Sequence, residues 1–375
     1  MSQPPEGPGS AYSSAGVDYS TLDAGKRSAL SEALATSGLL AAVSGCAVDE
    51  SRGEPAFVFE IGGQTLGFVL EGLGTKSIIA RQLQDELGPV GFENVAYDTV
   101  AAIVNDLCCV GALPLVVNAY FATGTSEWYR DAARLQALLR GWREGCVDAG
   151  ATWGGGESPS LPGLVAAEDI ELAGSAVGLV PPGRGPILGD ALAPGDEIVF
   201  VRSSGLHANG ASLARKIAAE LPAGYGTPLP SGRSFGQALL DRSLVYAGLV
   251  RRLAATEIEV HYLSHITGHG LLKLMRPRAE LGYVVRKLPQ VPEVLEFLVE
   301  HAGMSTAAAY STFNMGWGYA VYCGAGAGAR VVSLCAELGL HAEVAGAVTD
   351  GPRRVVLEPL GVVFESGDLD FTPRA

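Results

Sequence analysis

Four charged side chains suited to phosphate and metal chemistry stand close together in one stretch of the chain. Glu71 and Lys76 flank the turn G-L-G-T, which follows an expected strand over 65–70. Asp98 and Asp106 come next, on an apolar stretch that is typical of a helix. Carboxylates bind Mg²⁺, and glycine-bearing turns beside an ammonium group bind polyphosphate. This stretch therefore predicts a site for both.

The spacing differs from that of the common phosphate-binding loop. The loop G-x-x-x-x-G-K-[ST] places glycine directly before lysine, whereas here Thr75 precedes Lys76. A plain junction between a strand and a loop would give the same turn. The spacing alone leaves both interpretations open.

The composition limits the class of protein. Of 375 residues, 48% are apolar, which is enough for two domains of ordinary size. The net charge of −14 argues against a nucleic-acid partner, because clustered Lys and Arg bind phosphate backbones. The six cysteines form no C-x-x-C pattern and favour a reducing compartment. No signal peptide or membrane-spanning apolar run is visible, so we expect a cytoplasmic protein with no membrane partner.

The order of the expected elements predicts two domains. Both halves alternate strands and helices without a strict βαβ rhythm, which favours an α+β fold with mixed sheets. We expect a disordered leader over 1–11, a first domain over 12–182, a second domain over 183–360 and a tail over 361–375. One helix is expected at about 235–256.

A second polar cluster opens the second half. The run S-S-G-L-H-A-N-G over 203–210 lies between an expected strand and an expected helix. Such a loop aims backbone N–H groups and a helix N-terminus at an anion. Further along, His265 and His269 have the spacing of a metal-binding pair on a helix. Gly268 and Gly270 argue against a helix there.

Taken in order, these motifs resemble the aminoimidazole ribonucleotide synthetase family, also called phosphoribosylformylglycinamidine cyclo-ligase. The similarity runs from about Ala15 to Glu358. It rests on A-G-V-D at 15–18, D-A-G at 23–25, G-x-G-T-K at 72–76, V-N-D-L at 104–107, G-G-E at 155–157, S-S-G-x-H-x-N-G at 203–210, H-x-T-G-x-G at 265–270 and T-F-N-x-G-x-G at 312–318.

The resemblance implies a two-domain fold whose first-domain sheets pair across a homodimer to form a β-barrel. It implies ATP and Mg²⁺ as cofactors and formylglycinamidine ribonucleotide as the small-molecule substrate. In that family ATP phosphorylates the formamide oxygen. A neighbouring nitrogen then closes the imidazole ring and phosphate leaves.

The same resemblance implies roles for individual residues, by their position in these motifs. The metal candidates are Glu71, Asp98 and Asp106. The catalytic candidates are Lys76, Asp98 and His207. The ATP-binding candidates are Gly16, Asp18, Asp23, Gly25, Lys26, Gly72, Gly74, Thr75 and Asn105. The substrate-binding candidates are Glu157, Ser203, Ser204, Gly205, Asn209, Thr267, Gly268 and Asn314.

Four positions depart from the family pattern. Glu71 stands where the family usually has Asp, and Ser160 where it has a second acid. His269 replaces a glycine and Lys273 an asparagine. These departures leave two alternatives open: a diverged ATP-dependent enzyme with another substrate, and a nucleotide-binding dimer without turnover. Selenophosphate synthesis is disfavoured, because that family uses Cys or selenocysteine near its N-terminal glycine segment and the first cysteine here is Cys46.

Overall fold

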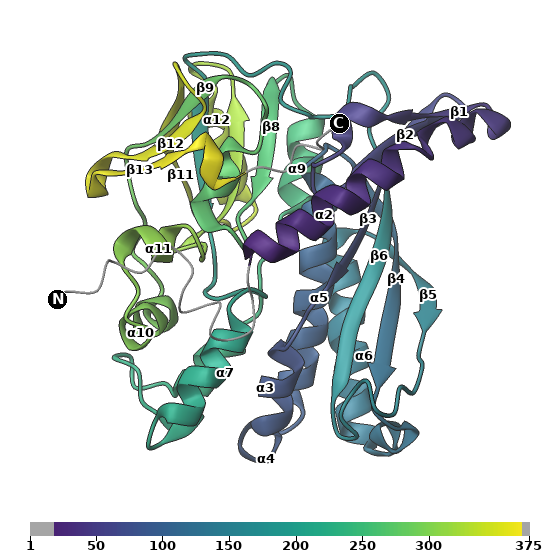
Figure 1. Cartoon of the computed structure of the whole chain (residues 1–375), viewed down its shortest axis with the longest axis vertical. Coiled ribbons are helices and arrows are strands. Elements are labelled where there is room, and N and C mark those ends of the chain that lie inside the picture. Colours follow the sequence, from purple (N-terminus) through teal and green to yellow (C-terminus); the bar gives the residue numbers. More distant parts are fainter. Residues whose placement is uncertain (1–18, 370–375) are drawn as a thin grey trace.

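The computed structural model describes residues 19–369, and its strands form two sheets (Figure 1). The first sheet has the order β1-β2-β3-β6-β4-β5 and the second the order β13-β12-β9-β11-β7-β10-β8. The strands of the first sheet are β1 (Gly45–Val48), β2 (Phe57–Ile61), β3 (Gln64–Gly72), β4 (Leu113–Thr123), β5 (Thr152–Glu157) and β6 (Ile170–Leu179). Those of the second are β7 (Glu197–Arg202), β8 (Val260–His265), β9 (Leu281–Val285), β10 (Trp317–Cys323), β11 (Ala342–Asp350), β12 (Arg354–Leu357) and β13 (Val362–Glu365).

Helices accompany both sheets. The α-helices are α2 (Tyr19–Leu34), α3 (Lys76–Gln82), α4 (Gln84–Leu87), α5 (Val90–Cys108), α6 (Ala132–Ala149), α7 (Ala211–Glu220), α8 (Phe235–Leu239), α9 (Ala247–Ala254), α10 (Glu293–His301), α11 (Thr306–Tyr310) and α12 (Gly328–Glu337). A 3-10 turn, η5 (Gly270–Met275), follows β8. No helix in the described part of the chain is long and apolar enough to cross a membrane.

Each sheet mixes strand directions, which confirms the expected α+β class. In the first sheet β4 pairs parallel with β5 and antiparallel with β6. In the second, β12 pairs parallel with β9 and antiparallel with β13. The β13 strand corrects the expected tail over 361–375. Its residues are apolar enough to extend the sheet, and Phe364 is buried against the core.

Only one face of the first sheet is covered by helices, as the burial pattern of β6 shows. Ile170, Leu172 and Ala176 alternate with partly exposed neighbours, and β6 packs against α5, which in turn packs against α6. The two helices approach closely at Gly141, where an added Cβ would lie 1.8 Å from the Glu93 carbonyl oxygen. The opposite face of the sheet carries no helix in the described residues.

The segment between α8 and α9 differs from the single helix expected at 235–256. Its backbone N–H groups are used by α5 instead of by a helix: Ser243 N donates to Asp98 and Tyr246 N donates to Asn105, at 2.6 and 2.8 Å. Asn105 also donates to the Leu244 carbonyl oxygen at 2.8 Å. We call residues 240–246 the strap, because they tie the second domain to α5.

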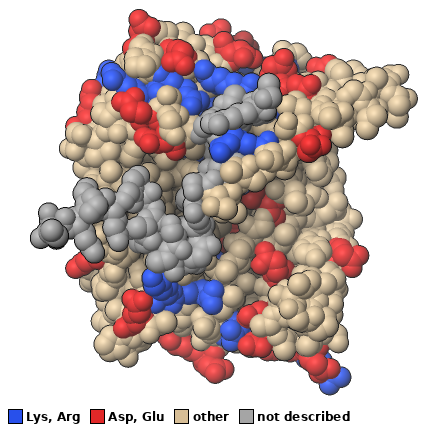
Figure 2. Space-filling view, viewed as in Figure 1, with Lys and Arg blue, Asp and Glu red and all other residues tan. Residues whose placement is uncertain are grey.

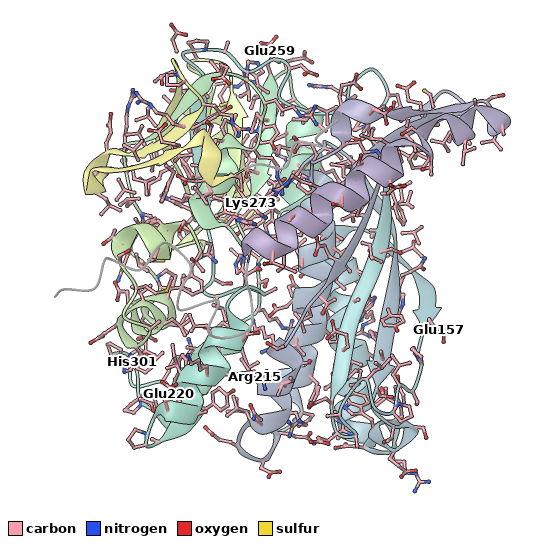
Figure 3. The ribbon with its side chains drawn as sticks, in the orientation of Figure 1. Glu157, Arg215, Glu220, Glu259, Lys273 and His301 are labelled. Atoms are coloured by element: carbon pink, nitrogen blue, oxygen red, sulfur yellow. The ribbon has the colours of Figure 1, made fainter. Side chains whose placement is uncertain are left out.

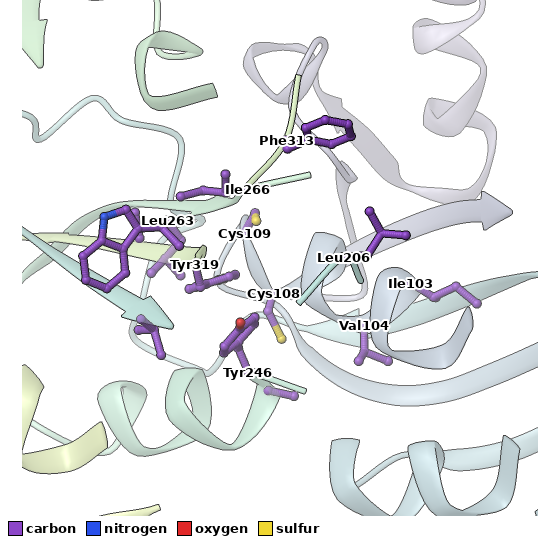
Figure 4. Close-up of a cluster of buried hydrophobic side chains, with 14 of the residues drawn as sticks. Ile103, Val104, Cys108, Cys109, Leu206, Tyr246, Leu263, Ile266, Phe313 and Tyr319 are labelled. Atoms are coloured by element: carbon purple, nitrogen blue, oxygen red, sulfur yellow. The ribbon is translucent and has the colours of Figure 1, made fainter. Parts of the chain in front are cut away.

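The buried core is continuous across the strap. Side chains of α5, such as Ile103 and Val104, belong to the same buried cluster as Leu206, Tyr246 and Tyr319 of the second domain (Figure 4). A shared core of this kind fixes how the two sheets face each other.

Candidate active site

A cleft of about 420 Å³ lies between the two domains. The end of β3 and the C-terminal part of α5 form its first wall, and β8, η5 and the loop before α7 form its second. Helix α2 borders it with Lys26, Arg27 and Leu30, and Figure 1 shows this helix crossing the molecule between the sheets. Both domains are therefore needed to build this cleft.

Two carboxylates meet on the first wall. Alternation along β3 places Glu71 on the same side as the buried Val69, toward α5, where it meets Asp106. Burial and the negative charge of Asp106 raise the pKa of Glu71 to about 7, and Lys273 opposes the shift. Burial would also raise the pKa of Asp106, but the hydrogen bond and charge of His265 hold it below its usual value. Thus Asp106 is the stronger acid of the two.

His265 orients Asp106 from the second domain. Its Nδ1 lies 2.6 Å from Asp106 Oδ1. Burial lowers the pKa of His265, although Asp106 favours the charged form. A neutral ring that donates through Nδ1 keeps its lone pair on Nε2.

The carboxylate pair fits Mg²⁺ if phosphate oxygens and waters supply the other ligands. No group of three or more His, Cys, Asp or Glu suited to a metal occurs within residues 19–369. Mg²⁺ is commonly held by one or two carboxylates, with waters and substrate phosphates completing its shell. The crowded pair Glu71–Asp106 would be relieved by such a cation. The donor set fits a metal that arrives with phosphate.

Cations stand opposite the carboxylates. Lys273 and Arg276 line the second wall, and Lys26 and Arg27 come from α2. Burial lowers the pKa of Lys273 to about 8, and the charge of Asp106 opposes that shift. Figure 2 shows Lys and Arg gathered on the face that α2 crosses, although the chain is acidic as a whole. A ligand with several negative charges would suit this mixture of acids and bases.

The three catalytic candidates come together outside the lining of this cleft. Lys76 Nζ lies 2.5 Å from Asp98 Oδ2 and 2.7 Å from the His207 carbonyl oxygen. The Lys76 and Asp98 side chains are fully buried. Burial and nearby positive charge lower the pKa of His207 to about 3, and its Nε2 accepts from Ser204 N. These groups form the junction between the domains.

Most of the serine and asparagine candidates also make contacts within the protein. Ser203 Oγ donates to Asn314 Oδ1 at 2.9 Å, and Asn314 Nδ2 donates to the Gly205 carbonyl oxygen at 2.9 Å. Ser204 Oγ donates to the Arg242 carbonyl oxygen of the strap. This network holds the loop 203–210 in shape beside the cleft.

The remaining candidates divide between the cleft and other places. Those that line the cleft are Lys26, Gly72, Asn209, Thr267 and Gly268, together with Glu71 and Asp106. Outside the lining, Gly25 lies within α2, Gly74 and Thr75 lie in the turn before α3, and Asn105 binds the strap. Asp23 lies in α2, without a described side chain, and Gly16 and Asp18 lie outside the described residues.

Glu157 stands apart from the cleft. It is exposed at the end of β5, the outermost strand of the first sheet, whereas Lys273 lies next to α2 (Figure 3). Any role of Glu157 in a site on its own subunit would require a large movement of β5.

The cleft is also lined by residues that are not among the site candidates expected from the motifs: Glu54, His265, Lys273 and Arg276. Tyr262 Oη donates to Glu54 Oε2 at 2.7 Å, and the charge of Arg276 acts on the same carboxylate. Burial still keeps the pKa of Glu54 raised. The sequence does contain a feature that indicates two of them. Lys273 and Arg276 closely follow the glycine-rich run 265–270, and both are cations in an otherwise apolar stretch.

Comparison with known proteins agrees with this two-domain site. Residues 53–180 match the model of AIR synthase related protein, N-terminal domain, and residues 193–358 match that of its C-terminal domain. A phosphoribosylformylglycinamidine cyclo-ligase of Sorangium cellulosum is 35% identical, over 97% of this chain and 98% of the relative. One of Methanothermobacter thermautotrophicus is 31% identical, over 92% and 96%.

A solved structure shares the fold. The hydrogenase maturation protein HypE in complex with ATP superposes with a TM-score of 0.53 at 18% identity, covering 72% of this chain and 77% of that one. With both domain models and relatives matched over nearly their whole length, the chain belongs to the AIR synthase related protein family.

Proposed function

We propose that this protein is an ATP-dependent cyclo-ligase that converts formylglycinamidine ribonucleotide to aminoimidazole ribonucleotide. The observation that carries the proposal is the cleft in which Glu71 and Asp106 face Lys273 and Arg276 across the two domains. Relatives of similar length bear the name of this activity, and the neighbouring HypE structure holds ATP.

The reaction requires electrostatic neutralisation and positioning. ATP transfers its γ-phosphoryl group to the formamide oxygen, the amidine nitrogen attacks the activated carbon, and phosphate leaves with that oxygen. Such transfers depend mainly on cations and N–H donors around the phosphoryl group. Mg²⁺, when bound with the polyphosphate, would supply part of this neutralisation. Glu71 and Asp106 are the residues that would hold it.

The protein's own cations provide the rest of the phosphate site. Arg276 presents a guanidinium that suits bidentate contact with phosphate oxygens. Lys26 and Arg27 line the cleft from α2. Asn209, Thr267 and Gly268 supply hydrogen-bonding groups on the second wall, where the ribonucleotide would be oriented.

In this proposal His265 receives the proton lost in ring closure. Its Nδ1 is fixed by Asp106, so Nε2 is the basic atom of a neutral ring. Burial lowers its pKa, so the ring is unprotonated and free of charge at neutral pH, although the same burial makes it a weaker base.

The direct test is turnover by the purified protein. With ATP, Mg²⁺ and formylglycinamidine ribonucleotide it should release aminoimidazole ribonucleotide, ADP and phosphate in equal amounts. Glu71→Gln should lower kcat at least about a hundredfold, because a metal-binding carboxylate is lost. Glu60→Gln, an exposed position on β2 of the same sheet, is the matched control and should retain full activity.

Two results would replace this proposal. ADP release only with a different acceptor would identify a diverged enzyme of the same family. ATP binding with no ADP release from any acceptor would identify a nucleotide-binding protein without turnover.

A homodimer is part of the proposal. The uncovered face of the first sheet carries Phe68 and Leu70, which are 42% and 70% exposed. Cross-strand register places Phe57 and Val177 on either side of Phe68, so these apolar side chains are neighbours. A second copy of the same face would cover them, as the β-barrel expected from the sequence requires.

Sedimentation can test the dimer. The wild-type protein should sediment as a dimer at micromolar concentration, and Phe68→Asp should shift it to a monomer. Val363→Asp, at an exposed apolar position of β13 in the second sheet, is the control and should stay dimeric. A wild-type monomer would exclude this arrangement.

A further inference from the structure

Lys273 lines the cleft on the second wall, opposite Glu71 and Asp106. It sits on η5, is buried, and donates a hydrogen bond from Nζ to Thr267 Oγ1. Its charge acts on both Glu71 and Asp106. Thr267 therefore holds the ammonium group in the same cleft that Glu71 and Asp106 line.

The charge balance explains why the ammonium is tolerated there. A buried lysine is costly unless opposite charge compensates it. Glu71 and Asp106 provide that compensation, since both favour the charged form of Lys273. Removing Lys273 would leave two carboxylates in contact, with His265 donating to only one of them.

We propose that Lys273 is a resident cation that offsets the negative charge of the Glu71–Asp106 pair and so opposes binding of a divalent ion in the absence of nucleotide. This inference rests on the proposed function, because it treats the pair as the metal end of the nucleotide site. Before nucleotide arrives, Lys273 neutralises the pair and makes free metal bind weakly. Metal then enters together with polyphosphate, whose oxygens add the ligands that the pair lacks.

Binding of Mn²⁺ in the absence of nucleotide tests this directly. Lys273→Gln removes the charge but keeps a donor for Thr267. At pH 7, electron paramagnetic resonance of free Mn²⁺ should show at least tenfold tighter binding to K273Q than to the wild type. Adding Glu71→Gln to K273Q should abolish the gain and so place it at the pair. Lys287→Gln, an exposed lysine after β9, is the control and should bind Mn²⁺ as the wild type does.

A gain below tenfold, or one that persists when Glu71 is also replaced, overturns the inference. Circular dichroism checks that the variants are folded. If K273Q is unfolded, Lys273→Met, which fills a similar volume without charge, is measured in its place.

The proposed function is judged separately, by calorimetric titration of the wild type with ATP and Mg²⁺. If the wild type does not bind ATP, the proposed function is wrong, and the Mn²⁺ measurement still reports on Lys273. If the wild type binds ATP but K273Q and the wild type bind Mn²⁺ equally well, only the inference about Lys273 is wrong.

Discussion

Helix α5 carries two aspartates with opposite surroundings. Asp98 accepts from Lys76 Nζ and from Ser243 N, and its side chain is fully buried. Asp106, about 12 Å further along the helix axis, lies against a second carboxylate and borders an open cleft. One aspartate is satisfied by the fold, and the other remains crowded by a like charge.

This difference separates a structural acid from one available to a ligand. A buried carboxylate with an ammonium and a backbone N–H as donors has little left to offer a metal. A carboxylate beside another carboxylate gains from any cation that arrives. The position of an acid in a motif does not reveal which case applies, because the partners that decide it come from elsewhere in the chain.

Breaking the Lys76–Asp98 pair should produce the largest effect. Lys76→Met leaves Asp98 buried with one donor lost and should lower the free energy of unfolding by about 3–5 kcal/mol. Urea unfolding followed by both tryptophan fluorescence and far-UV circular dichroism would measure it.

The double variant K76M/D98L is the matched comparison, because it removes both charges and should recover much of the loss. Lys287→Met should have no measurable effect on unfolding. A loss below about 1 kcal/mol in K76M would mean that the pair does not hold the domains together, and Lys76 would again be a candidate for the phosphate site.

The sequence was sufficient for some of these features and not for others. The family motifs already grouped Glu71 and Asp106 as metal candidates, and the two do meet in the structure. The hydrogen bonds that satisfy Lys76 and Asp98 depend on the strap, which follows these two residues by more than a hundred positions in the sequence. Its sequence has a helical pattern, but Asp98 and Asn105 take backbone donors that a helix would have used. Tertiary contacts overrode local preference there.

The same limit applies to the second wall of the cleft. His265, Lys273 and Arg276 become site residues only because the two sheets face each other across α5. No local pattern predicts that packing. The glycine-rich run 265–270 indicates that this segment belongs to the site, but it does not indicate which side chains enter the cleft.

The crowded pair should give the next largest effect, on stability as a function of pH. The pKa of Glu71 is raised to about 7 in the folded protein from an ordinary value near 4.5. Folding is therefore unaffected by this group below pH 4.5, and the folded state loses stability as pH rises through 7. Glu71→Gln should be more stable than the wild type above pH 7, on the order of 1–2 kcal/mol after solvent screening, with no gain at pH 4.

Thermal unfolding from pH 4 to pH 8 measures that difference. Asp98→Asn offers the contrast, since it weakens a satisfied acid and should be less stable than the wild type at neutral pH. If Glu71→Gln is destabilised at pH 8 as well, the pair is held by contacts other than those described, and the comparison between the two aspartates fails.

The smallest effect concerns Thr75, whose Oγ1 lies 2.9 Å from Ser212 Oγ in the second domain. Thr75→Val should cost about 1 kcal/mol, because it removes one partly buried hydrogen bond across the junction. Ser212→Ala should cost the same, and the double variant should cost little more than either, since both substitutions remove one interaction. Calorimetric titration with ATP and Mg²⁺ should give the same affinity within twofold for both single variants, because neither side chain lines the cleft. A tenfold loss of ATP affinity in T75V but not in S212A would instead assign Thr75 to the nucleotide site and extend that site from Glu71 to the start of α3.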